Sequence, residues 1–299
     1  MSLNAIDAAE PALRFPILRS RPSSGDRADR RSLAGSAALR AHGGKILAAG
    51  VSLGTLLLVW YLGTKYQIDA YIRFKNVPTP YAVLTEAREL VPTADFLVHI
   101  AKSLQRILAG FAIATLIGVP LGLVVGRYAR AAAFVMPSIE ALRPIPAIAW
   151  VPMAIMLWPT SESSIVFITF LGAFFPILLN TVHGVHAMDK VLLRAGTCLG
   201  ASEPRLFLHV VLPGALPHVF TGLAIGMGVA WVSLIAAEMI SGQYGIGYFT
   251  WEAYSLVDYP AIVLGMITIG ALGLVCSLAI RFAGRLAMPW LALAPGAQR

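Results

Sequence analysis

The chain has 299 residues, of which 58% are hydrophobic and only 13% are charged, with a mean hydropathy of +0.74. A soluble domain carries about 25% charged residues, so the composition excludes an ordinary soluble protein and indicates a membrane protein. The net charge of +8 does not predict nucleic-acid binding, because the basic excess lies in segments beside the apolar stretches, as the positive-inside rule requires.

Six apolar windows approach or reach the roughly 20 residues that a helix needs to cross a bilayer. Because backbone groups in lipid must be hydrogen-bonded internally, each window is predicted to be a helix. The sequence therefore predicts an all-α membrane protein with about six transmembrane helices in a domain over residues 45–290. The windows are Ile46–Gly63, Ile107–Gly126, Phe134–Trp158, Ile165–Val182, Val219–Ile240 and Ala261–Arg281.

Lysine and arginine concentrate in the N-terminal segment, after the second and fourth windows, and at the C-terminus. Cytoplasmic segments of membrane proteins are enriched in these residues. We therefore expect both termini and the connection over residues 187–217 to face the cytoplasm. Residues 1–44 are predicted to be a disordered basic cytoplasmic tail without a signal peptide, and residues 291–299 a second cytoplasmic tail.

The second window contains Gly118, Gly122 and Gly126 at four-residue spacing. This spacing predicts a flat groove for close helix packing, although glycine is common in membrane helices generally. Lys102 and Arg106 lie four residues apart just before the window. They could attract an anion or extend toward lipid phosphates, and the sequence leaves both interpretations open.

The third window is interrupted by prolines. Each interior proline removes a backbone hydrogen bond, which is tolerated where neighbouring helices or water satisfy the freed carbonyls. We therefore expect a broken span that lines a cavity and does not face lipid. The prolines are Pro137, Pro144, Pro146, Pro152 and Pro159.

Polar and aromatic residues of the spans are candidates for a translocation pathway: Arg143, Trp150, Asn180, Trp231, Ser233 and Glu238. Arg143 follows Glu140 by three residues, so the two can form a structural pair, with a substrate contact as the alternative. An acid in a span indicates function by default. Glu238 is also expected near the outer end, where it can reach water and anchor the loop Ser241–Trp251.

No motif for catalysis or metal binding stands out. Asn180, His183 and His186 recur near helical spacing, but no Glu or Cys completes a ligand set, so we predict no metal site. The doublet Gly44–Lys45 lacks the remaining residues of a phosphate-binding loop. We expect neither a catalytic residue nor a cofactor in this chain.

The stretch Leu199–Pro217 is sharply punctuated. Gly200 interrupts a preceding helix, Ser202 can cap the next helix with its side chain, and Glu203 and Pro204 suit a helix N-terminus. Pro213 and Pro217 are expected to end that helix. The sequence predicts two short helices joined by a bend that is exposed to another protein.

This stretch resembles the EAA loop of ABC importer permeases. That motif runs Glu-Ala-Ala, three residues, Gly, nine residues, an aliphatic residue, one residue, then Leu-Pro. Gly200, Val210, Leu212 and Pro213 match it, whereas the initial Glu-Ala-Ala is replaced by residues 194–196, Arg-Ala-Gly. Segments over roughly residues 78–290, such as "RPIPAIAWVPMAIMLW", are similar to permeases for nitrate, taurine and aliphatic sulfonates.

The resemblance implies a type I importer in a bacterial inner membrane, carrying a small anion. Its implied parts are a permease homodimer among membrane lipids, two ATPase subunits that bind ATP and Mg²⁺, and a periplasmic or lipid-anchored binding protein. The resemblance also implies that the bend docks in the ATPase. A stand-alone secondary transporter or channel is the alternative. The residues predicted to couple to the ATPase are Gly200, Ala201, Ser202, Glu203, Pro204, Arg205, Leu212 and Pro213.

Overall fold

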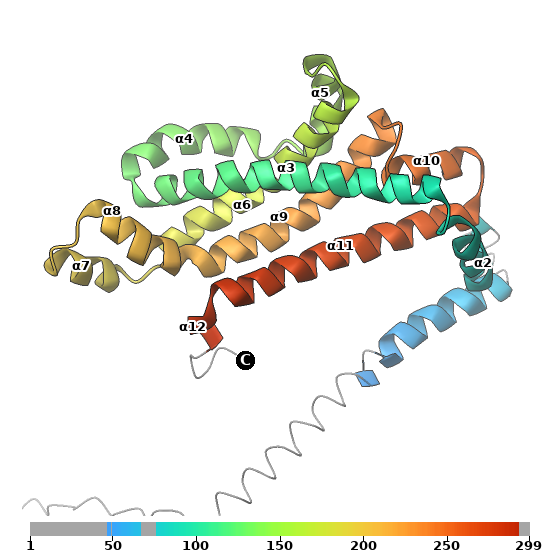
Figure 1. The fold of residues 1–299 in the computed structure, drawn as a ribbon, viewed down its shortest axis with the longest axis horizontal. Helices are drawn as coiled ribbons and strands as arrows, with labels where there is room; N and C mark the ends of the chain where they lie inside the picture. Colours follow the sequence, from blue (N-terminus) through green and yellow to red (C-terminus); the bar gives the residue numbers. More distant parts are fainter. Residues whose placement is uncertain (1–46, 49, 67–75, 293–299) are drawn as a thin grey trace, which may run out of the picture. The chain divides into compact units, whose positions relative to one another are not determined.

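The computed structural model describes residues 47–48, 50–66 and 76–292 (Figure 1). The predicted tail over residues 1–44 and most of the predicted C-terminal tail lie outside the described residues. The chain divides into two units, residues 1–60 and 61–299. In the first unit, residues 50–60 are helical and mostly exposed.

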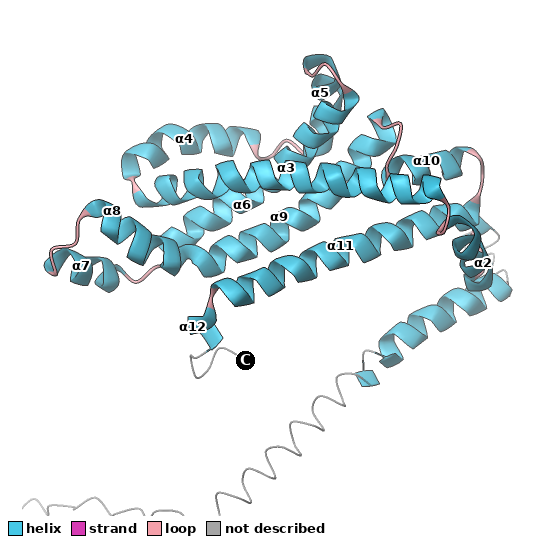
Figure 2. Cartoon of the chain, viewed as in Figure 1, coloured by secondary structure: helices cyan, strands magenta, loops and turns pink. Residues whose placement is uncertain are grey.

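The second unit is helical throughout its described residues, which contain no strand (Figure 2). It opens with helical residues 61–65. Its further helices are α2 (Pro80–Leu90), α3 (Ala94–Arg127), α4 (Ala129–Leu142), η2 (Ala147–Trp150), α5 (Val151–Leu157), α6 (Ser161–His186), α7 (Lys190–Cys198), α8 (Glu203–Leu206), η3 (Phe207–Val211), α9 (Leu212–Ser241), α10 (Ile246–Ser255), α11 (Tyr259–Ala287) and α12 (Pro289–Ala292).

Four described helices are long and apolar enough to cross a membrane: α3, α6, the continuous α8–α9 helix and α11. They contain the second, fourth, fifth and sixth predicted windows. The third window corresponds to a pair of helices, Ala129–Leu142 and Ala147–Leu157, bent by 84°. The first window stays a prediction, because it begins outside the described residues.

The predicted break in the third span is confirmed. Pro144 and Pro146 lie between α4 and η2, where the chain turns. Beyond the turn, Pro146 and Trp150 line a cavity of about 200 Å³ together with residues of α6 and α9. The structure thus agrees with a proline-rich segment that borders a cavity.

Helix α6 packs against α3 on one side and α9 on the other (Figure 1). Small residues allow this close approach. A Cβ atom added at Gly122 would lie 2.7 Å from the Thr181 Cβ, and one added at Gly126 would lie 2.7 Å from the Val185 Cβ. The predicted glycine groove of α3 therefore receives α6. Gly222 of α9 meets Asn180 of α6 in the same way.

The largest buried cluster lies where α3, α5, α6 and α9 meet, and it includes Ile107, Ile168, Ile177, Trp231 and Leu234. Many other large apolar residues of α3, α9 and α11 are exposed. Exposed apolar side chains along spans of this length suit lipid or a second protein chain as surroundings.

Candidate functional site

The coupling segment, residues 187–217, contains the predicted bend. Helix α7 begins after Asp189, whose side chain accepts a hydrogen bond from the Val191 amide at 2.8 Å. It ends at Cys198, and Gly200 follows with φ of +77°. Side chains disfavour this left-handed conformation, whereas glycine adopts it freely. The glycine therefore makes the reversal between α7 and α8 possible.

Helices α7 and α8 pack through one leucine. A Cβ atom added at Gly196 would lie 2.5 Å from the Leu206 Cδ2, and Leu206 is buried. The small residue at the third motif position thus leaves room for Leu206. Arg194, at the first motif position, is exposed on α7, and nothing in the structure explains why arginine replaces the acid.

A salt bridge joins the coupling segment to the C-terminal end of α3. Arg127 Nη2 donates to Glu203 Oε1 at 2.8 Å and to Glu203 Oε2 at 3.2 Å. The two side chains are 25% and 57% exposed, so the pair contributes about 0.2–1 kcal/mol. It nevertheless ties the first turn of α8 to a long helix.

Two sequence expectations for this segment are wrong. Ser202 occupies the N-cap position of α8, but its side chain makes no capping hydrogen bond. Pro213 and Pro217 do not end the helix: Pro213 lies in the first turn of α9, and Pro217 lies inside it. The π-helical turn Phe207–Val211 precedes Pro213. Because a proline ring clashes with the carbonyl four residues earlier, this wider turn lets the helix continue.

The outer face of the bend is open. Leu199 is 88% exposed, and Gly200, Ser202, Pro204 and Arg205 are exposed as well. A side chain added at Gly200 would meet no atom within 4 Å. Leu212 and Pro213 are half-buried at the start of α9, and Ala201 is half-buried beside the bend. The structure thus brings the predicted coupling residues into one continuous segment.

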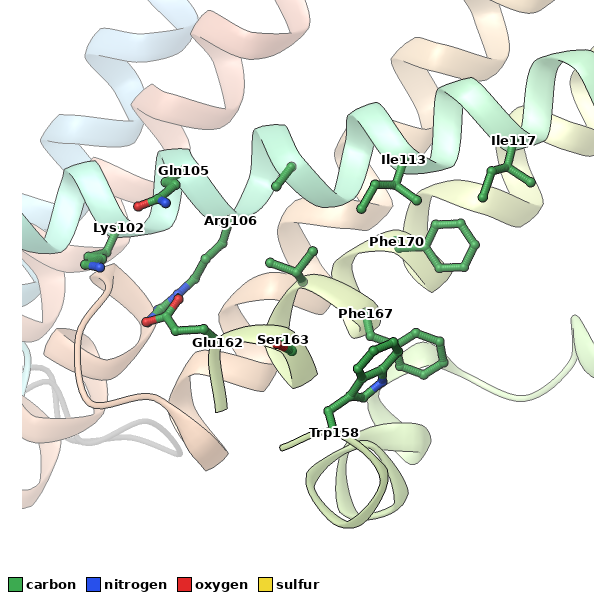
Figure 3. Close-up of a pocket in the computed structure, with 12 residues that line it drawn as sticks. Lys102, Gln105, Arg106, Ile113, Ile117, Trp158, Glu162, Ser163, Phe167 and Phe170 are labelled. Atoms are coloured by element: carbon green, nitrogen blue, oxygen red, sulfur yellow. The ribbon is translucent and has the colours of Figure 1, made fainter. Parts of the chain in front are cut away.

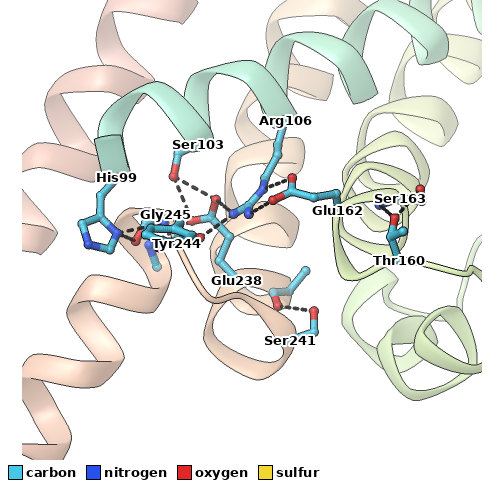
Figure 4. A network of polar contacts seen from close by, with 12 residues as sticks. His99, Ser103, Arg106, Thr160, Glu162, Ser163, Glu238, Ser241, Tyr244 and Gly245 are labelled. Carbon is cyan, nitrogen blue, oxygen red and sulfur yellow. Dashed lines mark hydrogen bonds and ion pairs between the residues drawn. The ribbon is translucent and has the colours of Figure 1, made fainter. Parts of the chain in front are cut away.

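A second polar site lies toward the other end of α3, and we call it the charge cluster: Ser103, Arg106, Glu162 and Glu238 (Figure 4). Arg106 is 2% exposed. Its Nε donates to Glu162 Oε2 at 2.8 Å and its Nη2 to Glu162 Oε1 at 2.5 Å. Its Nη1 donates to Glu238 Oε1 at 2.8 Å and to the Tyr244 carbonyl at 2.5 Å. One guanidinium thus joins α3, α6, α9 and the following loop.

The expectation that Glu238 reaches water is wrong, because its exposure is 0%. Ser103 Oγ lies 2.9 Å from both of its carboxylate oxygens, and the Gly247 amide donates to Oε2 at 3.0 Å. A fully buried carboxylate requires such partners. Through Gly247 and Arg106, Glu238 does anchor the loop after α9. Arg106 also does not extend to lipid phosphates, since it is paired inside the bundle.

The other predicted pathway residues do not converge on one site. Arg143 and Trp150 line the cavity of about 200 Å³ beside the broken span. Asn180 donates to the Pro176 carbonyl of its own helix at 2.8 Å, and Ser233 donates to the Val229 carbonyl at 2.9 Å. Trp231 belongs to the buried cluster.

Two further expectations concern pairs and metals. Glu140 and Arg143 are both exposed and form no ion pair within the part of the chain that the structure describes. Within the same residues, no group of three or more His, Cys, Asp and Glu side chains is placed so that it could hold a metal ion.

Sequence reasoning missed Ser103 and Glu162. The available signal was weak: Glu162 is an acid in the first turn of a span, at the same predicted membrane level as the basic Arg106. A cation and an acid at one level can pair once their helices touch.

Known proteins resemble this chain over most of its length. The model of the family "Binding-protein-dependent transport system inner membrane component" matches residues 118–292. The nitrate import permease protein NrtB of Synechocystis is 32% identical, covering 82% of this chain and 90% of that protein. The taurine transport system permease protein TauC of Escherichia coli is 31% identical, covering 80% and 88%.

A solved structure of the MetNI methionine ABC transporter, described as inward facing, has a chain with the same fold. The TM-score is 0.53 at 19% identity, and the match covers 62% of this chain and 93% of that chain. With the family match over residues 118–292, the observations agree: this chain belongs to the family of binding-protein-dependent transport system inner membrane components and is a permease subunit of an ATP-driven ABC importer.

Proposed function

We propose that the bend of the coupling segment, residues 199–205, docks on a separate ATPase and transmits its movement to the spans. The exposed, preformed bend carries this proposal: Leu199 projects into solvent and Gly200 holds the reversal. Glu203 is braced against α3 by Arg127. A contact surface held in its bound shape loses little entropy on binding.

The complete importer is proposed to contain two copies of this chain, two ATPase subunits and a periplasmic or lipid-anchored binding protein. ATP and Mg²⁺ would bind to the ATPase subunits. The assembly would lie in a bacterial inner membrane with both termini of this chain in the cytoplasm, as the distribution of Lys and Arg indicates.

The proposed cargo is a small oxyanion of the nitrate, taurine or alkanesulfonate class. NrtB and TauC, which are described as nitrate and taurine permease proteins, support this class. Titrating the cognate binding protein with nitrate, taurine, alkanesulfonates and bicarbonate tests it. Binding of only a cation or a sugar would overturn the cargo assignment.

The variant Gly200→Trp tests the coupling. A Cβ atom at this position would meet no neighbouring atom within 4 Å, so the bulky side chain would cover the proposed docking face, in addition to the strain of a side chain at φ of +77°. We expect normal insertion in the membrane and loss of ATP-driven uptake in proteoliposomes that contain the ATPase and the binding protein. Thr85→Trp on the exposed face of α2 is the matched control and should leave uptake intact. Unchanged uptake and substrate-stimulated ATPase activity in Gly200→Trp would exclude docking at this bend.

A further inference from the structure

A cavity of about 510 Å³ opens between α3 and α6 beside the charge cluster (Figure 3). Its polar end is formed by Lys102, Gln105, Arg106, Glu162 and Ser163. Its remaining wall is apolar, formed by Ile113, Ile117, Trp158, Val166, Phe167 and Phe170. The cavity therefore has the two halves that an anion with an apolar body would need.

The guanidinium of Arg106 already holds an anion at this polar end. Two parallel hydrogen bonds, from Nε and Nη2, reach the two oxygens of Glu162. This two-pronged geometry suits carboxylates and other oxyanions that present two oxygens side by side. Glu162 therefore occupies the position that an oxyanion in the cavity would take.

The two carboxylates on Arg106 differ in how readily they can leave. Glu238 is fully buried, whereas the Glu162 side chain is 52% exposed. Removing a buried partner leaves an uncompensated charge, whereas a half-exposed carboxylate can turn into water and regain its hydration, and an incoming oxyanion would then accept the two hydrogen bonds from Arg106. Glu162 is thus the exchangeable ligand of Arg106.

Lys102 adds a second positive charge. It lies four residues before Arg106, on the same face of α3, and lines the same polar end of the cavity, where the Arg106 side chain reaches Glu162 (Figure 3). Lys102 is half-buried, and none of the ion pairs between described residues includes it. With Glu162 in place, the charges of Lys102, Arg106, Glu162 and Glu238 sum to zero. A bound monoanion keeps this sum at zero only if the Glu162 carboxylate moves away from Arg106.

We infer that Arg106 and Lys102 form an oxyanion-binding site in this cavity, and that Glu162 is its internal competitor. The ligand presents an oxyanion to Arg106 and rests any apolar part against Phe167 and Phe170. Such a ligand can be a small soluble anion or the headgroup of an anionic lipid. The inference rests on the proposed function in one respect only: that a soluble anion bound here is also the transported cargo.

The test measures binding by calorimetry to the full chain, purified in a neutral detergent, with sodium nitrate and sodium hexanesulfonate as probes. Glu162→Gln should bind about tenfold more tightly than the parent, as expected for a site that is self-occupied about 90% of the time. Lys102→Gln should bind about fivefold more weakly, because one attractive charge is lost. Glu89→Gln, an exposed carboxylate of α2, is the control and should leave affinity unchanged.

The lipid source is tested in nanodiscs with or without phosphatidylglycerol in phosphatidylcholine, followed by native mass spectrometry. Retention of phosphatidylglycerol that rises in Glu162→Gln and falls in Lys102→Gln assigns the site to a lipid headgroup. The same pattern for the soluble probes assigns it to a free anion. If neither probe nor lipid responds to the two variants in opposite directions, the site is excluded. The measurement needs no ATPase, so failure of the coupling proposal would not affect it.

Discussion

The charge cluster and the coupling segment lie toward opposite ends of α3 and are built in opposite ways. In the cluster, one buried guanidinium is shared by two carboxylates and a backbone carbonyl from three other parts of the chain. In the coupling segment, the bend depends on the backbone of Gly200, with one surface salt bridge at Glu203. The first site is satisfied within the chain, while the second leaves its face open.

This difference is the one expected between a fixed joint and the docking surface that we propose. Buried polar groups must find their partners internally, because unpaired ones are costly. The groups of an exposed bend are hydrated instead and stay available for contact with another subunit. The free energy of unfolding should therefore depend strongly on the charge cluster and weakly on the coupling segment. ATP-driven uptake should depend more strongly on the coupling segment.

The largest loss of stability is expected for Glu238→Ala. It removes the buried acceptor of Ser103, Arg106 and Gly247, which should lower the free energy of unfolding by about 3–5 kcal/mol. Titration with a denaturing detergent measures this loss. Glu162→Ala removes the half-exposed partner and leaves the buried Nε and Nη2 donors of Arg106 without it, so it should cost less, about 1–3 kcal/mol. Equal losses in the two variants would contradict the distinction between the two carboxylates.

Ser103→Ala removes a smaller part of the same cluster. Its hydroxyl bridges Glu238 and the Ile246 amide, each at 2.9 Å. Loss of this bridge leaves both partners less satisfied, and we expect a destabilisation of about 1–3 kcal/mol in the same titration. Ser161→Ala, at an exposed serine in the first turn of α6, is the control. If Ser103→Ala lowers the free energy of unfolding no more than the control does, the charge cluster does not stabilise the fold.

Replacing Gly200 should separate stability from coupling. Gly200→Ala places a side chain at φ of +77°, which should cost about 1–2 kcal/mol locally, distort the bend and reduce ATP-driven uptake. Gly200→Asn should retain more uptake, because asparagine tolerates the left-handed region better. Hydrogen exchange of the coupling segment would record the local change. Equal uptake by the two variants would argue against a role for this backbone conformation.

The smallest effect on stability is expected at the salt bridge between Arg127 and Glu203. Arg127→Ala breaks the exposed pair with Glu203 and should change stability by about 0.2–1 kcal/mol. A double-mutant cycle with Glu203→Ala isolates the pair energy. A coupling energy above 2 kcal/mol would make this pair as strong as a buried contact and would erase the contrast between the two regions.

The sequence predicted those features that depend on neighbouring residues. Of the six apolar windows, four correspond to helices long enough to span a membrane; the glycine spacing predicted the α3 groove, and Gly200 predicted the bend. The partners of Arg106 lie 56 and 132 residues away, and no local pattern indicates which spans touch. Pro213 misled for a related reason: a proline stops a regular α-helix, but a wider preceding turn removes the clash.

The π-helical turn has a mechanical consequence. Because it carries the helix past Pro213, residues Glu203–Ser241 form one element of 39 residues. At about 1.5 Å per residue, about 50 Å separate Glu203 from Glu238 along this rod. If the proposed docking displaces its first turn, this one continuous helix would carry the displacement to the carboxylate that binds Arg106.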